Sequence, residues 1–137
     1  MDKLLDGKRI FLIEDDVRNV AVYSTNLRAH GAIIYEDVFG YGIVLHIKDS
    51  LPVDLIVLDI MLRRGTNGYD IYDQIRSEPE LKNIPIVAVT SLDPENEIPK
   101  AQEKKFDGFI SKPIDSRQFP KQLAAIIEGK KLWIVSR

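Results

Sequence analysis

The chain has 137 residues, of which 45% are hydrophobic and 29% charged, and its formal net charge is −2. This balance is typical of one folded domain and excludes a disordered chain, and without a basic excess neither DNA nor an anionic membrane is an expected partner. The absence of cysteine excludes disulfides, thiolate nucleophiles and cysteine-based zinc sites. Residues 1–6 are charged and lack the apolar core of a signal peptide, so we expect a cytoplasmic protein.

The first third of the chain alternates short apolar runs with amphipathic segments. Residues 9–13 (RIFLI) predict a strand, and residues 20–27 place apolar side chains on one face of a helix that ends near Gly31. A weaker strand is expected at 32–35. A second helix is expected at 39–47, weakened by two glycines.

The same alternation continues to the end of the chain. It predicts a strand at 53–58, a helix at 69–76, a strand at 84–89, a helix at 99–105, a strand at 108–110 and a helix at 119–128. Because proline fits only the first turn of a helix, Pro94 and Pro99 predict that the fourth helix begins late and is short. Five alternating strands and helices predict an α/β fold with a doubly wound parallel sheet. We expect one domain over residues 1–129 and a short, mildly β-like tail over 130–137.

Polar residues follow the predicted strands at the edge of the sheet where such folds bind ligands. Glu14, Asp15 and Asp16 follow the first strand, and Asp59 follows the third. The fourth strand ends in Thr90, and Lys112 follows the fifth. Three of these carboxylates, a hydroxyl and an ammonium group are therefore expected to meet at this edge.

These residue types suit phosphoryl transfer to a carboxylate. Carboxylates within about 4–6 Å repel each other unless a cation intervenes, and Mg²⁺ is the cation best suited to a few carboxylates and a phosphate. A carboxylate can also act as the nucleophile that forms an aspartyl phosphate. Taken singly, each residue has an ordinary interpretation, such as a helix cap for 14–16, a loop acid for Asp59, a strand residue for Thr90 or a surface lysine for Lys112. Their joint placement at successive strand ends favours a site.

Four segments, FLIEDD, VDLIVLDIML, IPIVAVTS and DGFISKPID, resemble the response-regulator receiver family of two-component signalling. The resemblance covers about residues 8–128 and implies a five-stranded sheet with strand order 2-1-3-4-5. It also implies the role of each site residue: Asp59 as phosphoacceptor, Glu14, Asp15, Asp59 and the Met61 backbone carbonyl as Mg²⁺ ligands, Lys112 as phosphate-binding lysine, and Thr90 and Phe109 as the switch pair.

The resemblance further implies how such a protein works. A histidine kinase or histidine phosphotransfer protein would donate the phosphoryl group, and a downstream protein would bind the face formed by the fourth helix, fifth strand and fifth helix. No direct contact with nucleic acid or membrane is implied. The protein would catalyse only its own phosphorylation and dephosphorylation, so it would not be an enzyme for a separate substrate. A cis peptide bond is implied between Lys112 and Pro113.

Three features depart from the family pattern. Family members often have a proline and then a glycine after the phosphoacceptor, whereas residues 62–68 (LRRGTNG) lack the proline and hold about one extra residue. The two prolines after Thr90 change the fourth helix, and Phe109 lacks the hydroxyl of the frequent tyrosine.

Three other functions fit the sequence less well than that of a receiver domain. A haloacid-dehalogenase-type phosphatase needs a second aspartate two positions after the first, where Met61 stands. A nucleotide or flavin binder needs a glycine-rich loop after the first strand, and none is present. A receiver-like interaction module that is never phosphorylated ranks second, because such modules usually lose the site residues that this chain keeps.

Overall fold

A parallel sheet of six strands forms the centre of the structure, a computed structural model that describes residues 3–38, 42–62 and 66–136. The strands are β1 (Arg9–Ile13), β2 (Ile33–Asp37), β3 (Leu55–Leu58), β4 (Ile86–Thr90), β5 (Gly108–Ser111) and β6 (Leu132–Ile134). The helices are α1 (Val17–Ala29), α2 (Ile43–Asp49), α3 (Gly68–Arg76), α4 (Pro94–Glu103) and α5 (Phe119–Ile127). The strand order is β2-β1-β3-β4-β5-β6, so the predicted fold class and the order of the first five strands are confirmed.

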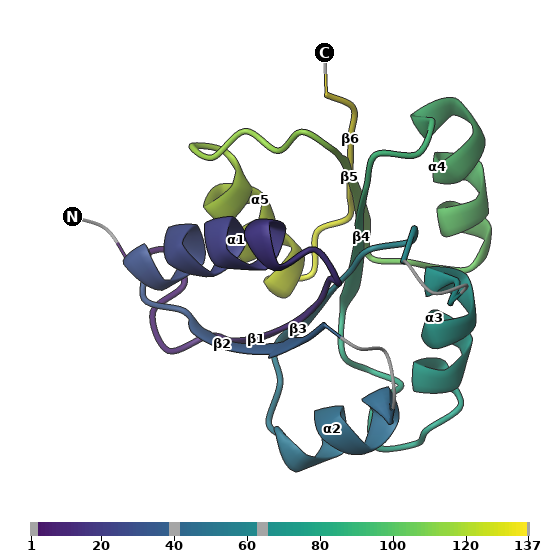
Figure 1. The fold of residues 1–137 in the computed structure, drawn as a ribbon, viewed down its shortest axis with the longest axis horizontal. Coiled ribbons are helices and arrows are strands. Elements are labelled where there is room, and N and C mark those ends of the chain that lie inside the picture. Colours follow the sequence, from purple (N-terminus) through teal and green to yellow (C-terminus); the bar gives the residue numbers. More distant parts are fainter. Residues whose placement is uncertain (1–2, 39–41, 63–65, 137) are drawn as a thin grey trace.

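Two hydrophobic cores lie on opposite faces of the sheet. Helices α1 and α5 cover one face, and α2, α3 and α4 cover the other (Figure 1). Side chains of β1 alternate between them, with Phe11 and Ile13 in the α2–α4 core and Ile10 and Leu12 in the α1–α5 core. The strand has to be apolar at every position because it is buried on both faces, which explains the continuous apolar runs in the sequence.

The segment predicted as a tail extends the sheet. Leu132, Trp133 and Ile134 pair in parallel with β5, with Trp133 in register with Phe109. Leu132 and Ile134 pack against the α1–α5 core and Trp133 packs against the other core. This two-sided packing accounts for a sixth strand that the sequence signalled only weakly.

The prediction of a late fourth helix is wrong. Helix α4 begins at Pro94, because a first-turn proline needs no hydrogen-bond partner and the side chain of Asp93 accepts a hydrogen bond from the Glu95 N–H at 3.0 Å. Pro99 lies inside the helix, which continues to Glu103.

Helix α2, in contrast, begins later than predicted. The expected residues 39–41 lie outside the described part of the chain, and α2 runs over Ile43–Asp49 after Gly42, whose φ is 58°.

Among the described helices, none combines the length and apolar character that a membrane span requires.

Candidate functional site

The predicted site residues converge at the carboxyl ends of β1, β3 and β5. They border a hollow of about 380 Å³. Its lining consists of Glu14, Asp15, Asp16, Asn19, Asp59, Met61, Leu62, Ser91 and Lys112. The hollow is therefore lined mainly by charged and polar side chains, as expected for a site that handles an anion and a cation.

Three carboxylates crowd one corner of this hollow. Oxygens of Glu14, Asp15 and Asp59 all lie within 4.8 Å of one another, and Glu14 and Asp59 are only 4% and 5% exposed. Burial, together with the hydrogen bond and like charge of Glu14, raises the pKa of Asp59 to about 7. Such a set of hard oxygen donors fits a divalent cation, which would relieve the repulsion.

Lys112 supplies the cation that the structure already contains. Its Nζ lies 3.1 Å from Asp59 Oδ2 and 3.2 Å from Glu14 Oε2. Burial lowers the pKa of Lys112, but the carboxylates of Asp59 and Glu14 raise it by more, so the net direction is upward. The side chain therefore stays an ammonium group directed at the carboxylates. The peptide bond between Lys112 and Pro113 is cis, as predicted.

Helix α1 contributes a residue that the sequence analysis missed. Asp16 caps the helix by accepting a hydrogen bond from the Arg18 N–H at 2.9 Å, which fixes the first turn against the end of β1. In that turn Asn19 donates its side-chain amide to Glu14 Oε1 at 3.0 Å. A polar residue in the first helical turn after an acidic run was the available signal.

The chain returns to the site after β3 through a close backbone approach. Gly68 donates its N–H to the Ile60 carbonyl at 2.8 Å, and a β-carbon at Gly68 would lie 2.6 Å from the Asp59 carbonyl oxygen. Only glycine fits there, which gives a reason for the glycine expected after the phosphoacceptor. Asp59 Oδ1 accepts a hydrogen bond from the Met61 N–H at 3.0 Å, which holds the carboxylate in place.

The comparisons with known proteins agree with this geometry. The profile of the response regulator receiver domain matches residues 10–124. The chain belongs to the response-regulator receiver family. It is 25% identical to the phosphate regulon regulator PhoB of Rhizobium meliloti over 93% of this chain and 56% of that protein. It is also 25% identical to PilH of Pseudomonas aeruginosa, over 88% of this chain and 98% of that protein. It thus spans about half of PhoB and nearly all of PilH.

Solved receiver structures share the fold of this receiver domain. A response regulator from Chloroflexus aurantiacus superposes with a TM-score of 0.79 at 22% identity, covering 90% of this chain and 99% of that one. The receiver domain of the sensor histidine kinase PA1611 from Pseudomonas aeruginosa has a TM-score of 0.77 at 22% identity, with the same coverage. That structure is described as holding a magnesium ion in its active-site cleft.

Thr90 and Phe109 are the predicted switch pair. Thr90 is fully buried at the end of β4, and its Oγ1 accepts a hydrogen bond from the Leu92 N–H at 3.2 Å. Ser91, rather than Thr90, lines the hollow. Phe109 is fully buried in the core beneath α3 and α4, so this structure shows the buried arrangement of its ring. Its predicted movement stays a prediction, as does the Met61 carbonyl as a metal ligand.

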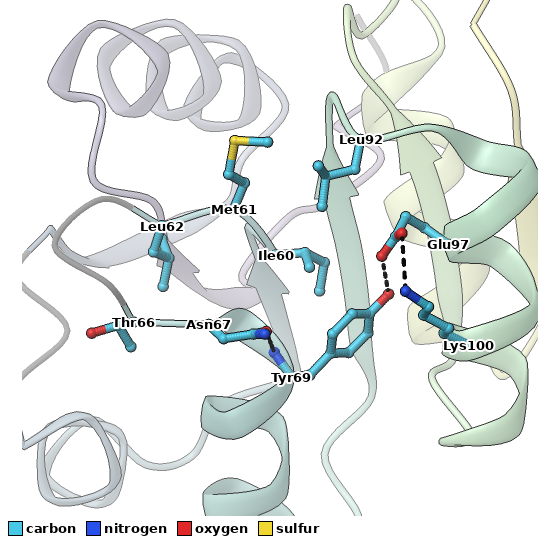
Figure 2. Close-up of a pocket in the computed structure, with 9 residues that line it drawn as sticks. All are labelled: Ile60, Met61, Leu62, Thr66, Asn67, Tyr69, Leu92, Glu97 and Lys100. Carbon is cyan, nitrogen blue, oxygen red and sulfur yellow. Dashed lines mark hydrogen bonds and ion pairs between the residues drawn. The ribbon is translucent and has the colours of Figure 1, made fainter.

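A second hollow adjoins that of Asp59 and reaches α4. It has a volume of about 450 Å³, and Met61 and Leu92 both border it (Figure 2). On its far side the Tyr69 hydroxyl donates to Glu97 Oε1 at 2.8 Å, and Lys100 Nζ lies 3.5 Å from Glu97 Oε2 (Figure 2). The hollow therefore links the site to a polar contact that ties α3 to α4.

Proposed function

We propose that this receiver domain accepts a phosphoryl group on Asp59 from a histidine kinase or a histidine phosphotransfer protein. One observation carries the proposal: Asp59 is a nearly buried carboxylate that contacts Lys112 and lies beside two further carboxylates. A structural ion pair would not require a third carboxylate, that of Asp15, beside the two that contact Lys112. The arrangement suits a nucleophile whose product, an aspartyl phosphate, carries more negative charge than the starting carboxylate.

In the proposed reaction a carboxylate oxygen of Asp59 attacks the phosphorus atom of the donor. A bond forms between this oxygen and phosphorus, the phosphorus–nitrogen bond to the donor histidine breaks, and the electron pair leaves with the imidazole. Lys112 is placed to neutralise charge on the transferred group, because its Nζ lies 3.1 Å from Asp59 Oδ2. The Met61 N–H keeps the other carboxylate oxygen oriented.

Mg²⁺ fits the donor set and is the proposed cofactor. Glu14, Asp15 and Asp59 would hold it together with the Met61 backbone carbonyl, Asp15 directly and Glu14 through water. The ion would neutralise negative charge on the phosphoryl oxygens during transfer. Asn19 would keep Glu14 oriented, since its amide already donates to Glu14 Oε1 at 3.0 Å. The magnesium described in the PA1611 receiver domain supports the same assignment here.

The proposed output is a change in protein contacts, made in the cytoplasm without direct binding to nucleic acid or membrane. The resemblance to receiver domains implies an output surface formed by the fourth helix, fifth strand and fifth helix. In this chain β6 covers the outer edge of β5, so a downstream protein would meet α4, β6 and α5 instead of an open β5 edge. The domain would act on no separate substrate.

Incubation with acetyl phosphate and Mg²⁺, followed by intact-mass measurement, tests the proposal. We expect one phosphoryl adduct on the wild type, no adduct when a chelator is present from the start of the incubation, and no adduct on Asp59→Asn. Asp70→Asn is the matched control, because Asp70 is an exposed acid in α3 and should leave labelling unchanged. An unlabelled wild type, or labelling of Asp59→Asn equal to wild type, would favour the alternative of an interaction module that is never phosphorylated.

A further inference from the structure

The outer strand of the sheet, β6, has features that favour pairing with a strand of another chain. Natural edge strands usually carry charges or prolines that prevent pairing with another chain. Here the residues of β6 and the next position are Leu132, Trp133, Ile134 and Val135, without a charge or a proline. Val135 is 44% exposed. One side of β6 pairs with β5, and in the described order no strand follows β6 on the other side.

The side chains along this edge divide between the two faces of the sheet. Trp133 packs against the α2–α4 core, while Leu132 and Ile134 pack against the α1–α5 core. Extending the alternation of β6 by one residue at each end places Lys131 and Val135 on the same face as Trp133. Val135 borders a hollow of about 530 Å³ beside α4, and it also borders a hollow that Gln118 and Gln122 line.

Charges of opposite sign lie at the two ends of this edge. The exposed Lys131 stands where β6 begins, whereas Asp93 and Glu95 border the hollow where β6 ends, together with Pro94, Ile98 and Pro99. Four residues of extended chain separate Lys131 from Val135, which is about 13 Å. A second strand running in the opposite direction would bring its own lysine to the acidic end.

We propose that two copies of this chain associate by pairing their β6 strands in antiparallel fashion about a two-fold axis at Trp133. Each β6 then faces its own symmetry mate, as in any isologous contact, and the two sheets join into one. Trp133 lies opposite its counterpart, and Lys131 of each copy lies opposite Val135 of the other, on the α4 face. There it is placed to pair with Asp93 and Glu95 of the other copy.

In this register, side-chain contacts stabilise the strand pair in addition to the backbone hydrogen bonds. Directly opposed aromatic residues and opposite charges on the same face each stabilise a strand pair, by about 0.2–1 kcal/mol. The strand is nevertheless short, with three paired residues, and the contact area is correspondingly small. The dimer should therefore be weak and depend on concentration.

Sedimentation velocity over a wide range of protein concentrations measures the association directly. We expect a shift from the 15.6 kDa monomer to a species of twice that mass. Trp133 is the one tryptophan of the chain, so its emission reports on this edge selectively. Its emission maximum should move to shorter wavelength over the same concentration range.

Charge exchange tests the register. Lys131→Glu and Glu95→Lys should each weaken dimerisation by roughly tenfold, and the double variant should restore it, because it exchanges the two charges across the interface. Lys8→Glu is the matched control, since Lys8 is exposed and precedes β1, away from β6 in the strand order. All substituted residues are exposed, so unfolding curves should match the wild type.

Three results would overturn the proposal. One is a monomer at every concentration. Another is a dimer that neither Lys131→Glu nor Glu95→Lys weakens, which would place the contact elsewhere on the molecule. The third is a double variant that dimerises no better than the single variants. Pairing of β6 with the peptide of another protein, with no self-association, would show as the first result.

Discussion

Two nearly buried carboxylates in this receiver domain have opposite surroundings. Asp59 is 5% exposed, and its burial together with the hydrogen bond and like charge of Glu14 raises its pKa to about 7 despite its contact with Lys112. Glu97 is 7% exposed and accepts a hydrogen bond from the Tyr69 hydroxyl. The carboxylate of Asp59 is repelled by that of Glu14, whereas the carboxylate of Glu97 accepts a hydrogen bond that links α3 to α4.

This difference is the one expected between the proposed phosphorylation site and a structural contact. Repulsion among buried acids costs folding free energy, and this cost is retained where a ligand or a reaction removes it. At α4, burial and the hydrogen bond to Glu97 raise the pKa of Tyr69, which keeps its hydroxyl protonated as a donor. The two regions meet at Met61 and Leu62, which border both the hollow of Asp59 and the hollow that Tyr69 and Glu97 line (Figure 2).

Removing the charge of Asp59 should produce the largest stability effect. The raised pKa means that the folded state binds a proton at Asp59 more tightly than the unfolded state does, so this carboxylate lowers stability as the pH rises from about 4 to about 7. Without Mg²⁺, Asp59→Asn should therefore raise the free energy of unfolding by about 1–3 kcal/mol at pH 8 and by close to nothing at pH 4. Urea unfolding at several pH values measures the difference. An effect that is equal at all pH values would contradict the assigned repulsion.

Removing the donor to Glu97 should destabilise the domain instead. In Tyr69→Phe the carboxylate loses its hydrogen bond but stays buried, which should lower the free energy of unfolding by about 1–2 kcal/mol. Tyr35→Phe is the matched control, because the Tyr35 ring packs beneath the Arg9 guanidinium at 4.9 Å and this contact does not need the hydroxyl. Equal unfolding curves for wild type and Tyr69→Phe would show that the contact contributes nothing.

The sequence predicts that the charged residues around Asp59 meet, but it does not predict the contact between α3 and α4. Glu14, Asp59 and Lys112 follow apolar strands, and the geometry of a parallel sheet brings such positions together whatever the loops do. Tyr69 and Glu97 are 28 residues apart on different helices. Their meeting depends on how α3 and α4 pack, which periodicity alone does not specify.

The start of α4 and the presence of β6 are two further features that local sequence patterns did not predict. The sequence predicts that Pro94 delays the fourth helix, whereas Pro94 stands in the first turn, directly after the N-cap residue Asp93. Residues 132–134 form a strand because their side chains reach both cores across the edge of β5. A run of three apolar residues is too short for its pattern to predict that placement.

The apolar residues beside Asp59 should prolong the life of the phosphoryl group. Met61 borders the site, Leu92 borders the adjoining hollow, and neither side chain can orient an attacking water through a strong hydrogen bond. A variant with Met61→Asn and Leu92→Glu should therefore lose the phosphoryl group roughly threefold to tenfold faster than the wild type. Decay followed by intact mass after removal of acetyl phosphate gives both rates. Equal or slower decay in the variant would contradict this role.

The smallest expected effect concerns communication between the two carboxylates. A phosphoryl group on Asp59 would attract the Thr90 hydroxyl, which accepts a hydrogen bond from the Leu92 N–H at 3.2 Å, and α4 begins two residues after Leu92. Beryllofluoride, a phosphoryl mimic, should therefore change the amide exchange rates in α4 and around Phe109. The expected change is a few fold, because two such conformations differ by only a few kcal/mol and the mimic shifts part of this difference. Tyr69→Phe should enlarge the change in α4, because it removes a hydrogen bond that resists movement. If only the loops touching Asp59 respond and residues 91–112 do not, the two regions are independent and the switch role of Thr90 and Phe109 is wrong.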